Sequence, residues 1–300
     1  MQIGIVGLGK MGGNMTRKLL DNNHDIVVYD VDDEQVNKYE KLGAESSKSL
    51  KELTEKLDEP KKVIWVMVPA GDIVDETVKK LANYLKKGDI IIDGGNSNYK
   101  DSIKLADKLE KKGINFLDVG TSGGVWGLKE GYCLMVGGPK RAYQYVETIL
   151  KDLAPDKGYN YIGPSGSGHF VKMVHNGIEY AMMEAYAEGF EILKSKEEFD
   201  IDLGEVAELW NHGGVIRSWL LELTANSLHN NPELEGIKDY VEDSGEGRWT
   251  VLESIEQEIP ASVIAISLFK RFRSRQDTSF SARMLSAMRN AFGGHEIKEE

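Results

Sequence analysis

Four polar side chains share one face of a predicted helix in the middle of the chain. In the segment KMVHNGIEY, Lys172, His175, Asn176 and Glu179 stand at positions i, i+3, i+4 and i+7. This spacing places them on one side of an α-helix. A helix that packs on a hydrophobic core usually carries apolar residues on that side. The face is therefore predicted to look either into solvent or into a polar pocket.

These residue types are suited to acid–base chemistry on an alcohol. A lysine in a buried position can accept the hydroxyl proton, and a glutamate can deliver a proton in a later step. Histidine and asparagine can hold the reacting hydroxyl by hydrogen bonds. Each residue taken alone also fits an ordinary solvated helix surface. The four together, directly after the glycine-rich segment GPSGSG at 163–168, favour a catalytic role.

A glycine-rich turn near the N-terminus predicts a dinucleotide site. The segment GLGKMG has the pattern G-x-G-x-x-G at Gly7, Gly9 and Gly12, between the β-rich run QIGIV and a helical pattern. Such glycines let backbone N–H groups approach a pyrophosphate. Asp30 ends the second β-rich run, where a carboxylate would bind the ribose 2′-hydroxyl and repel a 2′-phosphate. The prediction is NAD rather than NADP.

Two further loops follow β-rich runs of the same half, VPAG at 68–71 and GGNSN at 94–98. Ligands of a doubly wound sheet lie at the carboxyl ends of its strands, so both loops should line the cofactor crevice. The predicted cofactor-binding residues are Gly7, Leu8, Gly9, Lys10, Met11, Gly12, Asp30, Val68, Pro69, Ala70 and Asn96.

The order of patterns along the chain predicts two domains. The first half alternates β-rich runs with helical patterns, which indicates βαβ units, and a last β-rich run lies near YCLMVGG. Long helical patterns follow, at about 170–194, 203–211, 216–228, 263–273 and 279–292. The fold class is thus a doubly wound, Rossmann-type α/β sheet at 1–163, followed by an all-α domain at 164–300 that binds substrate and forms the oligomer.

Composition excludes several classes of protein. The net charge of −12 argues against a nucleic-acid partner. No apolar run reaches the roughly 20 residues of a membrane-spanning helix, so no membrane partner is expected. The one cysteine, Cys133, favours a reducing compartment, and we expect a cytoplasmic protein. The six histidines are scattered, so no metal site is predicted. Six basic residues against one acid between Lys270 and Arg289 fit either a solvated surface or an anion site.

Seven motifs together resemble one enzyme family. They are GLGKMG, MVPAG, DGGNS, TSGG, GSGHFVKMVHNGIEYAMMEAYAE, GEGRWT and MRNAFGGH, in order from Gly4 to His295. They are similar to 6-phosphogluconate dehydrogenase (decarboxylating), in its short, generally NAD-linked bacterial form. The resemblance implies oxidation of the C3 hydroxyl of 6-phosphogluconate, loss of CO2 and formation of ribulose 5-phosphate in gluconate and pentose phosphate metabolism.

The resemblance also implies roles for individual residues. Lys172 matches the general base and Glu179 the acid that protonates the enediol. The residues that match substrate contacts are Asn96, Ser122, Gly123, Gly124, His175 and Asn176 for the carboxylate and hydroxyls, and Tyr180, Arg248, Thr250, Arg271, Arg289 and His295 for the phosphate. The family supplies the last two from a neighbouring subunit, which implies a homodimer or homotetramer.

Two other functions remain open at the level of sequence. A non-decarboxylating β-hydroxyacid dehydrogenase, acting on an acid such as 3-hydroxyisobutyrate, would share the fold and the lysine. It would leave Glu179, Arg271 and Arg289 without a role. A catalytically idle dinucleotide-binding sensor is the second alternative, and it would be expected to lack the base or the acid.

Overall fold

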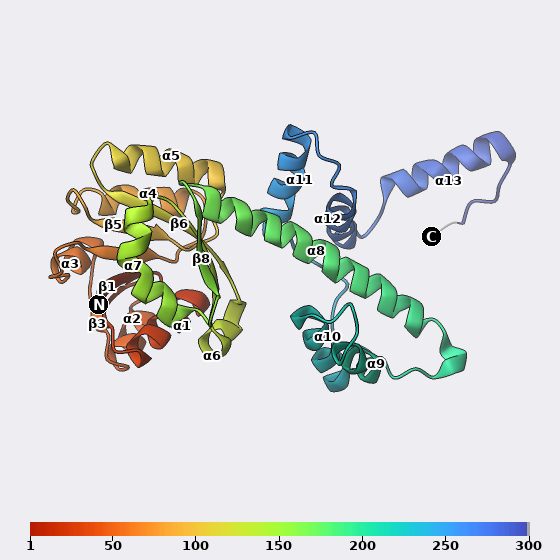
Figure 1. Cartoon of the computed structure of the whole chain (residues 1–300). Helices are drawn as coiled ribbons and strands as arrows, with labels where there is room; N and C mark the ends of the chain where they lie inside the picture. Colours follow the sequence, from red (N-terminus) through yellow and green to blue (C-terminus); the bar gives the residue numbers. More distant parts are fainter. Residues whose placement is uncertain (299–300) are drawn as a thin grey trace. The chain divides into compact units, whose positions relative to one another are not determined.

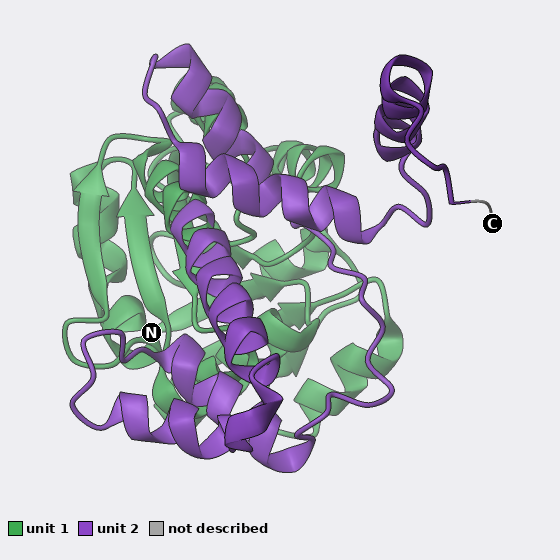
Figure 2. Ribbon diagram, turned by 90° about the vertical axis from the view of Figure 1, so that its right-hand side faces the viewer, with its two compact units in different colours: residues 1–176 green, residues 177–300 purple. Residues whose placement is uncertain are grey.

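The computed structural model describes residues 1–298 and divides by its internal contacts into two compact units. The first unit is Met1–Asn176, and the second begins at Gly177 (Figure 2). This division falls inside helix α8 (Ser167–Lys194). The division by contacts comes later in the chain than the boundary at residue 163 expected from the change of pattern. One helix therefore contributes residues to both units.

The first unit is built on one eight-stranded sheet in the order β3-β2-β1-β4-β5-β6-β7-β8 (Figure 1). All neighbouring strands run parallel except β6 and β7, which are antiparallel. The mostly parallel, doubly wound sheet confirms the predicted fold class. Its strands are β1 (Gln2–Val6), β2 (Asp25–Tyr29), β3 (Glu45–Ser46), β4 (Val63–Val66), β5 (Ile90–Asp93), β6 (Asn115–Ser122), β7 (Cys133–Gly137) and β8 (Tyr159–Gly163).

Helices cover both faces of this sheet and close a core on each. One core joins residues of α1, α2 and α7 to the strands, and the other joins residues of α3, α4 and α5 to the opposite face. Central strands that are covered on both sides should be apolar throughout, and β4 (VIWV) is buried along its whole length. The helices are α1 (Lys10–Asp21), α2 (Asp33–Glu40), α3 (Leu50–Glu55), α4 (Asp72–Leu81), α5 (Tyr99–Glu110), η1 (Gly124–Trp126), α6 (Gly127–Glu130) and α7 (Lys140–Leu153).

The second unit is helical, as the long periodic patterns predicted. Besides the later part of α8 it contains η2 (Glu197–Phe199), α9 (Leu203–Asn211), α10 (Trp219–Asn230), α11 (Glu246–Glu256), α12 (Ser262–Ser274) and α13 (Phe280–Gly293). Its buried apolar cluster joins α8, α9 and α10 through Phe190, Ala207, Leu221, Ala225 and Leu228. No helix within residues 1–298 has both the length and the apolar character needed to cross a bilayer.

Several elements depart from the expected pattern, including β3, α3 and α6, which were not predicted, and three others have an identifiable local cause. Helix α10 begins at Trp219 rather than near residue 216, because Ser218 caps it by accepting a hydrogen bond from the N–H of Leu221. Strand β8 was not predicted, since it lies at the edge of the sheet and its residues are only partly covered. Helix α11 was not predicted either, because its buried residues are Glu246, Gly247 and Thr250 rather than an apolar stripe.

Candidate active site

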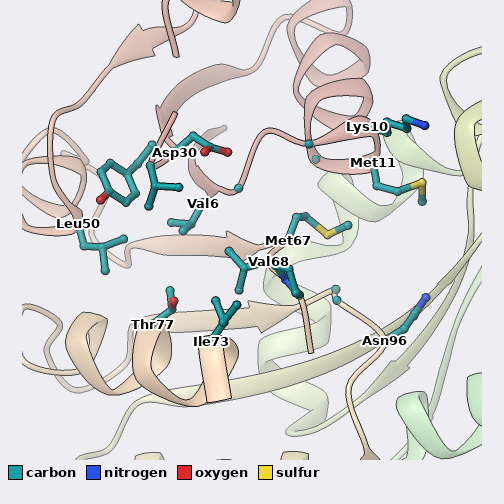
Figure 3. Close-up of a pocket in the computed structure, with 18 of the residues that line it drawn as sticks. Val6, Lys10, Met11, Asp30, Leu50, Met67, Val68, Ile73, Thr77 and Asn96 are labelled. Carbon is teal, nitrogen blue, oxygen red and sulfur yellow. The ribbon is translucent and has the colours of Figure 1, made fainter. Parts of the chain in front are cut away.

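A cavity of about 820 Å³ lies at the carboxyl ends of the parallel strands in the first unit. Figure 3 shows Asp30 and Asn96 at opposite ends of it. Nine of the predicted cofactor residues line it, namely Gly7, Gly9, Lys10, Met11, Gly12, Asp30, Val68, Pro69 and Asn96. Leu8 and Ala70 are not among the described residues that line this cavity. Leu8 instead points into the core with 1% of its surface exposed.

Several residues that line the cavity were not predicted from the sequence, because they belong to no recognised motif. Ile73, Thr77 and Lys80 line the cavity from α4, and Leu50 lines it from α3. The first three stand at i, i+4 and i+7 of one helix. That spacing, on a helix that follows the VPAG loop, is the signal that could have identified them.

The glycine turn has the geometry that a diphosphate requires. Gly7 adopts a φ of +94°, and a Cβ at Gly12 would overlap the carbonyl oxygen of Gly7. A Cβ at Gly9 would meet nothing within 4 Å, so the backbone is open on that side. No side chain caps the first turn of α1, and its early N–H groups have no partner within the helix. These features fit an anionic ligand at the start of α1.

The carboxylate of Asp30 is held by backbone groups at the end of β2. Oδ2 accepts a hydrogen bond from the N–H of Leu8 at 2.5 Å, and Oδ1 accepts one from the N–H of Asp32 at 2.9 Å. A carboxylate oxygen can accept more than one hydrogen bond, so both oxygens keep capacity for ribose hydroxyls. Asp30 is therefore oriented by the glycine turn before any ligand binds.

Asn96 connects the loop after β5 to the end of β6. Its Nδ2 donates to the carbonyl oxygen of Thr121 at 2.9 Å, and its Oδ1 accepts from the N–H of the same residue at 2.8 Å. Its φ of +54° lies in the left-handed region, which asparagine tolerates better than most residues. This pairing fixes the amide beside Ser122 and leaves one N–H and one lone pair for a ligand.

The polar face of α8 forms one hydrogen-bonded network with the last residue of β6. Lys172 Nζ donates to Asn176 Oδ1, and His175 Nδ1 lies 3.1 Å from the same oxygen. His175 Nε2 lies 3.4 Å from the Ser122 hydroxyl. Because an amide oxygen only accepts, His175 donates through Nδ1 to Asn176, and its Nε2 faces the Ser122 hydroxyl. Four predicted site residues are thus brought together.

Glycines allow α8 to lie directly on the sheet. A Cβ at Gly120 of β6 would stand 2.5 Å from the Cβ of Lys172, and a Cβ at Gly168 would overlap the carbonyl oxygens of Asp118 and Met135. The stem of Lys172 therefore passes over bare backbone, and the residue is only 5% exposed. This approach sets the position of the lysine relative to the strand ends.

Asp118 ties the first turn of α8 to β6. Its Oδ1 accepts from the N–H of Gly166 at 2.7 Å, and its Oδ2 accepts from the N–H of His169 at 3.0 Å. Burial raises the pKa of this carboxyl group, while the two N–H bonds and the nearby His169 act in the opposite direction. The helix start also favours a negative charge.

In the second unit, four of the predicted phosphate residues lie on or close to the first turns of α11. The Arg271 guanidinium lies 3.5 Å from the centre of the Tyr180 ring, and a Cβ at Gly247 would stand 2.5 Å from that ring. Thr250 lies against α8, because a Cβ at Gly177 would stand 2.7 Å from its methyl group. Arg248 is on the first turn of α11. Glu179 precedes Tyr180 on α8 and is partly exposed.

Arg289 and His295 are placed differently from the rest of the predicted phosphate set. Both are exposed, Arg289 on α13 and His295 just after it. Within the described chain, α13 buries none of its residues, although Phe280, Met288 and Phe292 are large and apolar. Large apolar side chains are therefore exposed on this helix.

The fold and the cavity define a dinucleotide-dependent dehydrogenase. Two family models then cover most of the chain, the NAD-binding domain of 6-phosphogluconate dehydrogenase at residues 2–163 and the 6-phosphogluconate dehydrogenase C-terminal domain at 168–279. The chain belongs to the 6-phosphogluconate dehydrogenase family.

Two relatives match along all or nearly all of their length. The Bacillus subtilis protein YqeC, provisionally named a 6-phosphogluconate dehydrogenase, is 46% identical over 300 residues, 100% of both chains. The NAD+-dependent, decarboxylating 6-phosphogluconate dehydrogenase of Haloferax volcanii is 44% identical over 300 residues, 99% of this chain and 98% of the relative.

Two solved structures share the fold of this chain, and the first of them is a 6-phosphogluconate dehydrogenase. The 6-phosphogluconate dehydrogenase of Plasmodium falciparum is 33% identical with a TM-score of 0.85, and the match covers 100% of this chain and 66% of that one. The 3-hydroxyisobutyrate dehydrogenase of Mycobacterium tuberculosis shares the fold at 20% identity and a TM-score of 0.74, covering 95% of this chain and 98% of that one.

The close contact at Gly120 generates a prediction. In Gly120→Ala the new methyl group must displace Lys172, so we expect dehydrogenase turnover to fall by roughly 10²-fold. NAD binding, measured by calorimetry, should be unchanged because the cofactor cavity is lined by other residues. The matched control is Gly189→Ala on α8, where a Cβ meets nothing within 4 Å. Equal turnover in the two variants would contradict the account of this contact.

Proposed function

We propose that this chain catalyses the oxidative decarboxylation of 6-phosphogluconate to ribulose 5-phosphate and CO2, with reduction of NAD. The observation that carries the proposal is the network of Lys172, His175, Asn176 and Ser122 beside the strand ends of a dinucleotide fold. Family membership supports the choice of substrate. The reaction belongs to gluconate and pentose phosphate metabolism, and the single cysteine is consistent with a cytoplasmic location.

Lys172 acts as the general base in the first step. It takes the proton of the C3 hydroxyl, while His175 and Asn176 hold that hydroxyl by hydrogen bonds. Bound NAD supplies the hydride acceptor for the hydrogen on C3. The same Asn176 oxygen that accepts from Lys172 and His175 keeps both groups in a fixed relation through this step.

Two further steps, with three proton transfers between them, complete the reaction. The protonated Lys172 donates to the C3 ketone oxygen as the C1–C2 bond breaks and CO2 leaves, which places the bonding electrons in an enediol. Lys172 then takes the proton back from the enediol hydroxyl as Glu179 protonates the carbon that becomes C1 of ribulose 5-phosphate. Lys172 ends this sequence protonated and Glu179 ends it deprotonated. Transfer of one proton from Lys172 to Glu179, by way of solvent, restores both groups before the next turnover.

Backbone groups and hydroxyls hold the carboxylate end of the substrate. Ser122 is the last residue of β6, and Gly123 and Gly124 follow it with positive φ angles. N–H groups and a hydroxyl bind a carboxylate without a full positive charge, so they do not strongly oppose loss of CO2. Asn96 contacts the sugar hydroxyls or the nicotinamide from the opposite loop.

Charged side chains bind the phosphate. Tyr180, Arg248, Thr250 and Arg271 supply the contacts from the chain itself. Charge-assisted hydrogen bonds to a phosphate are strong and provide binding energy that is remote from the reacting carbon. Arg289 and His295 complete the set from a second copy of the chain in a homodimer or homotetramer, which gives the exposed apolar face of α13 a partner.

The reaction itself is tested by its stoichiometry. We expect 6-phosphogluconate and NAD to give NADH and CO2 in equal amounts, with NADH followed at 340 nm and CO2 trapped in parallel. Lys172→Met should abolish turnover and retain NAD binding. NADH without CO2 would indicate a non-decarboxylating dehydrogenase, and NAD binding with no turnover on any hydroxy acid would indicate a sensor.

The preference for NAD follows from the charge of Asp30. In Asp30→Asn the repulsion of a 2′-phosphate is removed, so the ratio of kcat/KM for NAD to that for NADP should fall by about tenfold or more, equivalent to about 1.4 kcal/mol. Asp33→Asn, an exposed residue at the start of α2, is the control for loss of one charge. An unchanged ratio in Asp30→Asn would refute this basis for cofactor choice.

The contribution of Arg289 from a second copy can be tested by complementation. Lys172→Met and Arg289→Ala should each be inactive alone. Co-expression of the two variants should restore about a quarter of wild-type activity, because half the random dimers contain one site with both native residues. If Arg289 acts within its own chain, the mixed assemblies stay inactive.

A further inference from the structure

A carboxylate beside the proposed phosphate residues holds two arginines at once. Asp243 lies in the segment before α11, and only 4% of its side chain is exposed. Its Oδ1 accepts from Arg248 Nε at 2.8 Å, and its Oδ2 accepts from Arg248 Nη2 at 3.0 Å. Oδ2 also lies 3.0 Å from Nη1 of Arg275. One buried carboxylate therefore bridges two guanidinium groups.

An aromatic ring supports the same pair of cations. The guanidinium carbon of Arg248 lies 4.5 Å from the centre of the Phe272 ring, and that of Arg275 lies 5.2 Å from it. Two guanidinium groups this close would repel each other without an intervening anion. Asp243 and Phe272 together stabilise the arrangement, which keeps one net positive charge beside Tyr180 and Arg271.

The bidentate pair also determines which donors Arg248 can present to a ligand. A guanidinium group carries five N–H donors in a planar fork. Asp243 uses the Nε donor and one donor of Nη2, so three donors remain on the far side of the group. Because Asp243 holds the planar guanidinium group of Arg248 at two points, the direction of the three remaining donors is fixed. The pKa of the Asp243 carboxyl is lowered chiefly by the hydrogen bond from Arg248, so the pair is ionic at neutral pH.

We propose that Asp243 is a positioning residue for phosphate recognition, which it achieves by fixing Arg248, and that Arg275 is a further cation of the same subsite. This inference rests on the proposed function, because it takes Arg248 as a phosphate ligand. It adds two residues that no motif identified. Asp243 touches no substrate atom and acts only through the arginines.

Asp243→Asn is the informative variant. An asparagine keeps the side-chain oxygen that accepts from the N–H of Gly245 at 3.2 Å, so the turn before α11 is preserved. It loses the charge and one of the two acceptors for Arg248. We expect KM for 6-phosphogluconate to rise about tenfold, with kcat changed less than about threefold and KM for NAD unchanged.

Asp243→Asn has two opposing effects on KM for 6-phosphogluconate, so the direction in which KM changes shows which effect is larger. Removal of a carboxylate near a phosphate site would by itself favour an anion and lower KM. Arg248 is 49% exposed, so solvent screens that charge effect, and the loss of a fixed fork should dominate. Asp277→Asn, an exposed acid in the same basic segment, controls for net charge and should leave KM unchanged.

A double-mutant cycle separates positioning from a general structural role. In an Arg248→Ala background, adding Asp243→Asn should raise KM by less than about twofold, because its main partner is gone. Asp243→Glu should recover part of the lost affinity. A KM that stays the same or falls in Asp243→Asn, or an equal rise in the Arg248→Ala background, would overturn the inference.

Failure of the proposed function can be told apart from failure of this inference. Inorganic phosphate is titrated into wild type, Asp243→Asn and Arg275→Ala by calorimetry, without reference to turnover. Weaker phosphate binding in both variants supports the subsite even if 6-phosphogluconate is not oxidised. Phosphate binding equal to wild type in both variants refutes it even if 6-phosphogluconate is turned over.

Discussion

The position of α8 against the sheet is the constraint on which the rest of the first unit depends. Gly120, Gly137 and Gly168 leave backbone bare where the helix begins, so side chains at these positions would collide with Lys172, with Asp118 or with strand carbonyl groups. Asp118 then accepts hydrogen bonds from the first N–H groups of the helix. Because the protein interior is close-packed, this contact allows the helix only a single position along the strand.

That constraint links the two halves of the chemistry. The strands end at the cofactor cavity, and Asn96 connects the loop after β5 to the backbone of Thr121. One residue further on, Ser122 lies within reach of His175, which shares the Asn176 oxygen with Lys172. In the proposed function, the acid–base group and the cofactor site are therefore built at the same strand ends, where doubly wound sheets generally bind their ligands.

Much of this could be predicted from local sequence. The remaining parts could not be predicted, for physical reasons. The alternation of β-rich and helical runs predicted the sheet, and helical spacing predicted the shared face of Lys172, His175 and Asn176. Edge strand β8 and the polar-faced helix α11 lack the periodicity on which such predictions depend. Asp118 and Asp243 act through contacts that the folded chain alone creates, and the Asp118 bonds join residues 48 and 51 positions apart.

The central claim is that Lys172 and Glu179 form the acid–base pair, and exchange of the C1 hydrogen of ribulose 5-phosphate tests it most directly. The sugar phosphate would be incubated with enzyme and NADH in D2O, and C1 would be followed by proton NMR. The account predicts that wild type replaces one C1 hydrogen with deuterium and that Lys172→Met and Glu179→Gln do not. Exchange at the wild-type rate in either variant would contradict it.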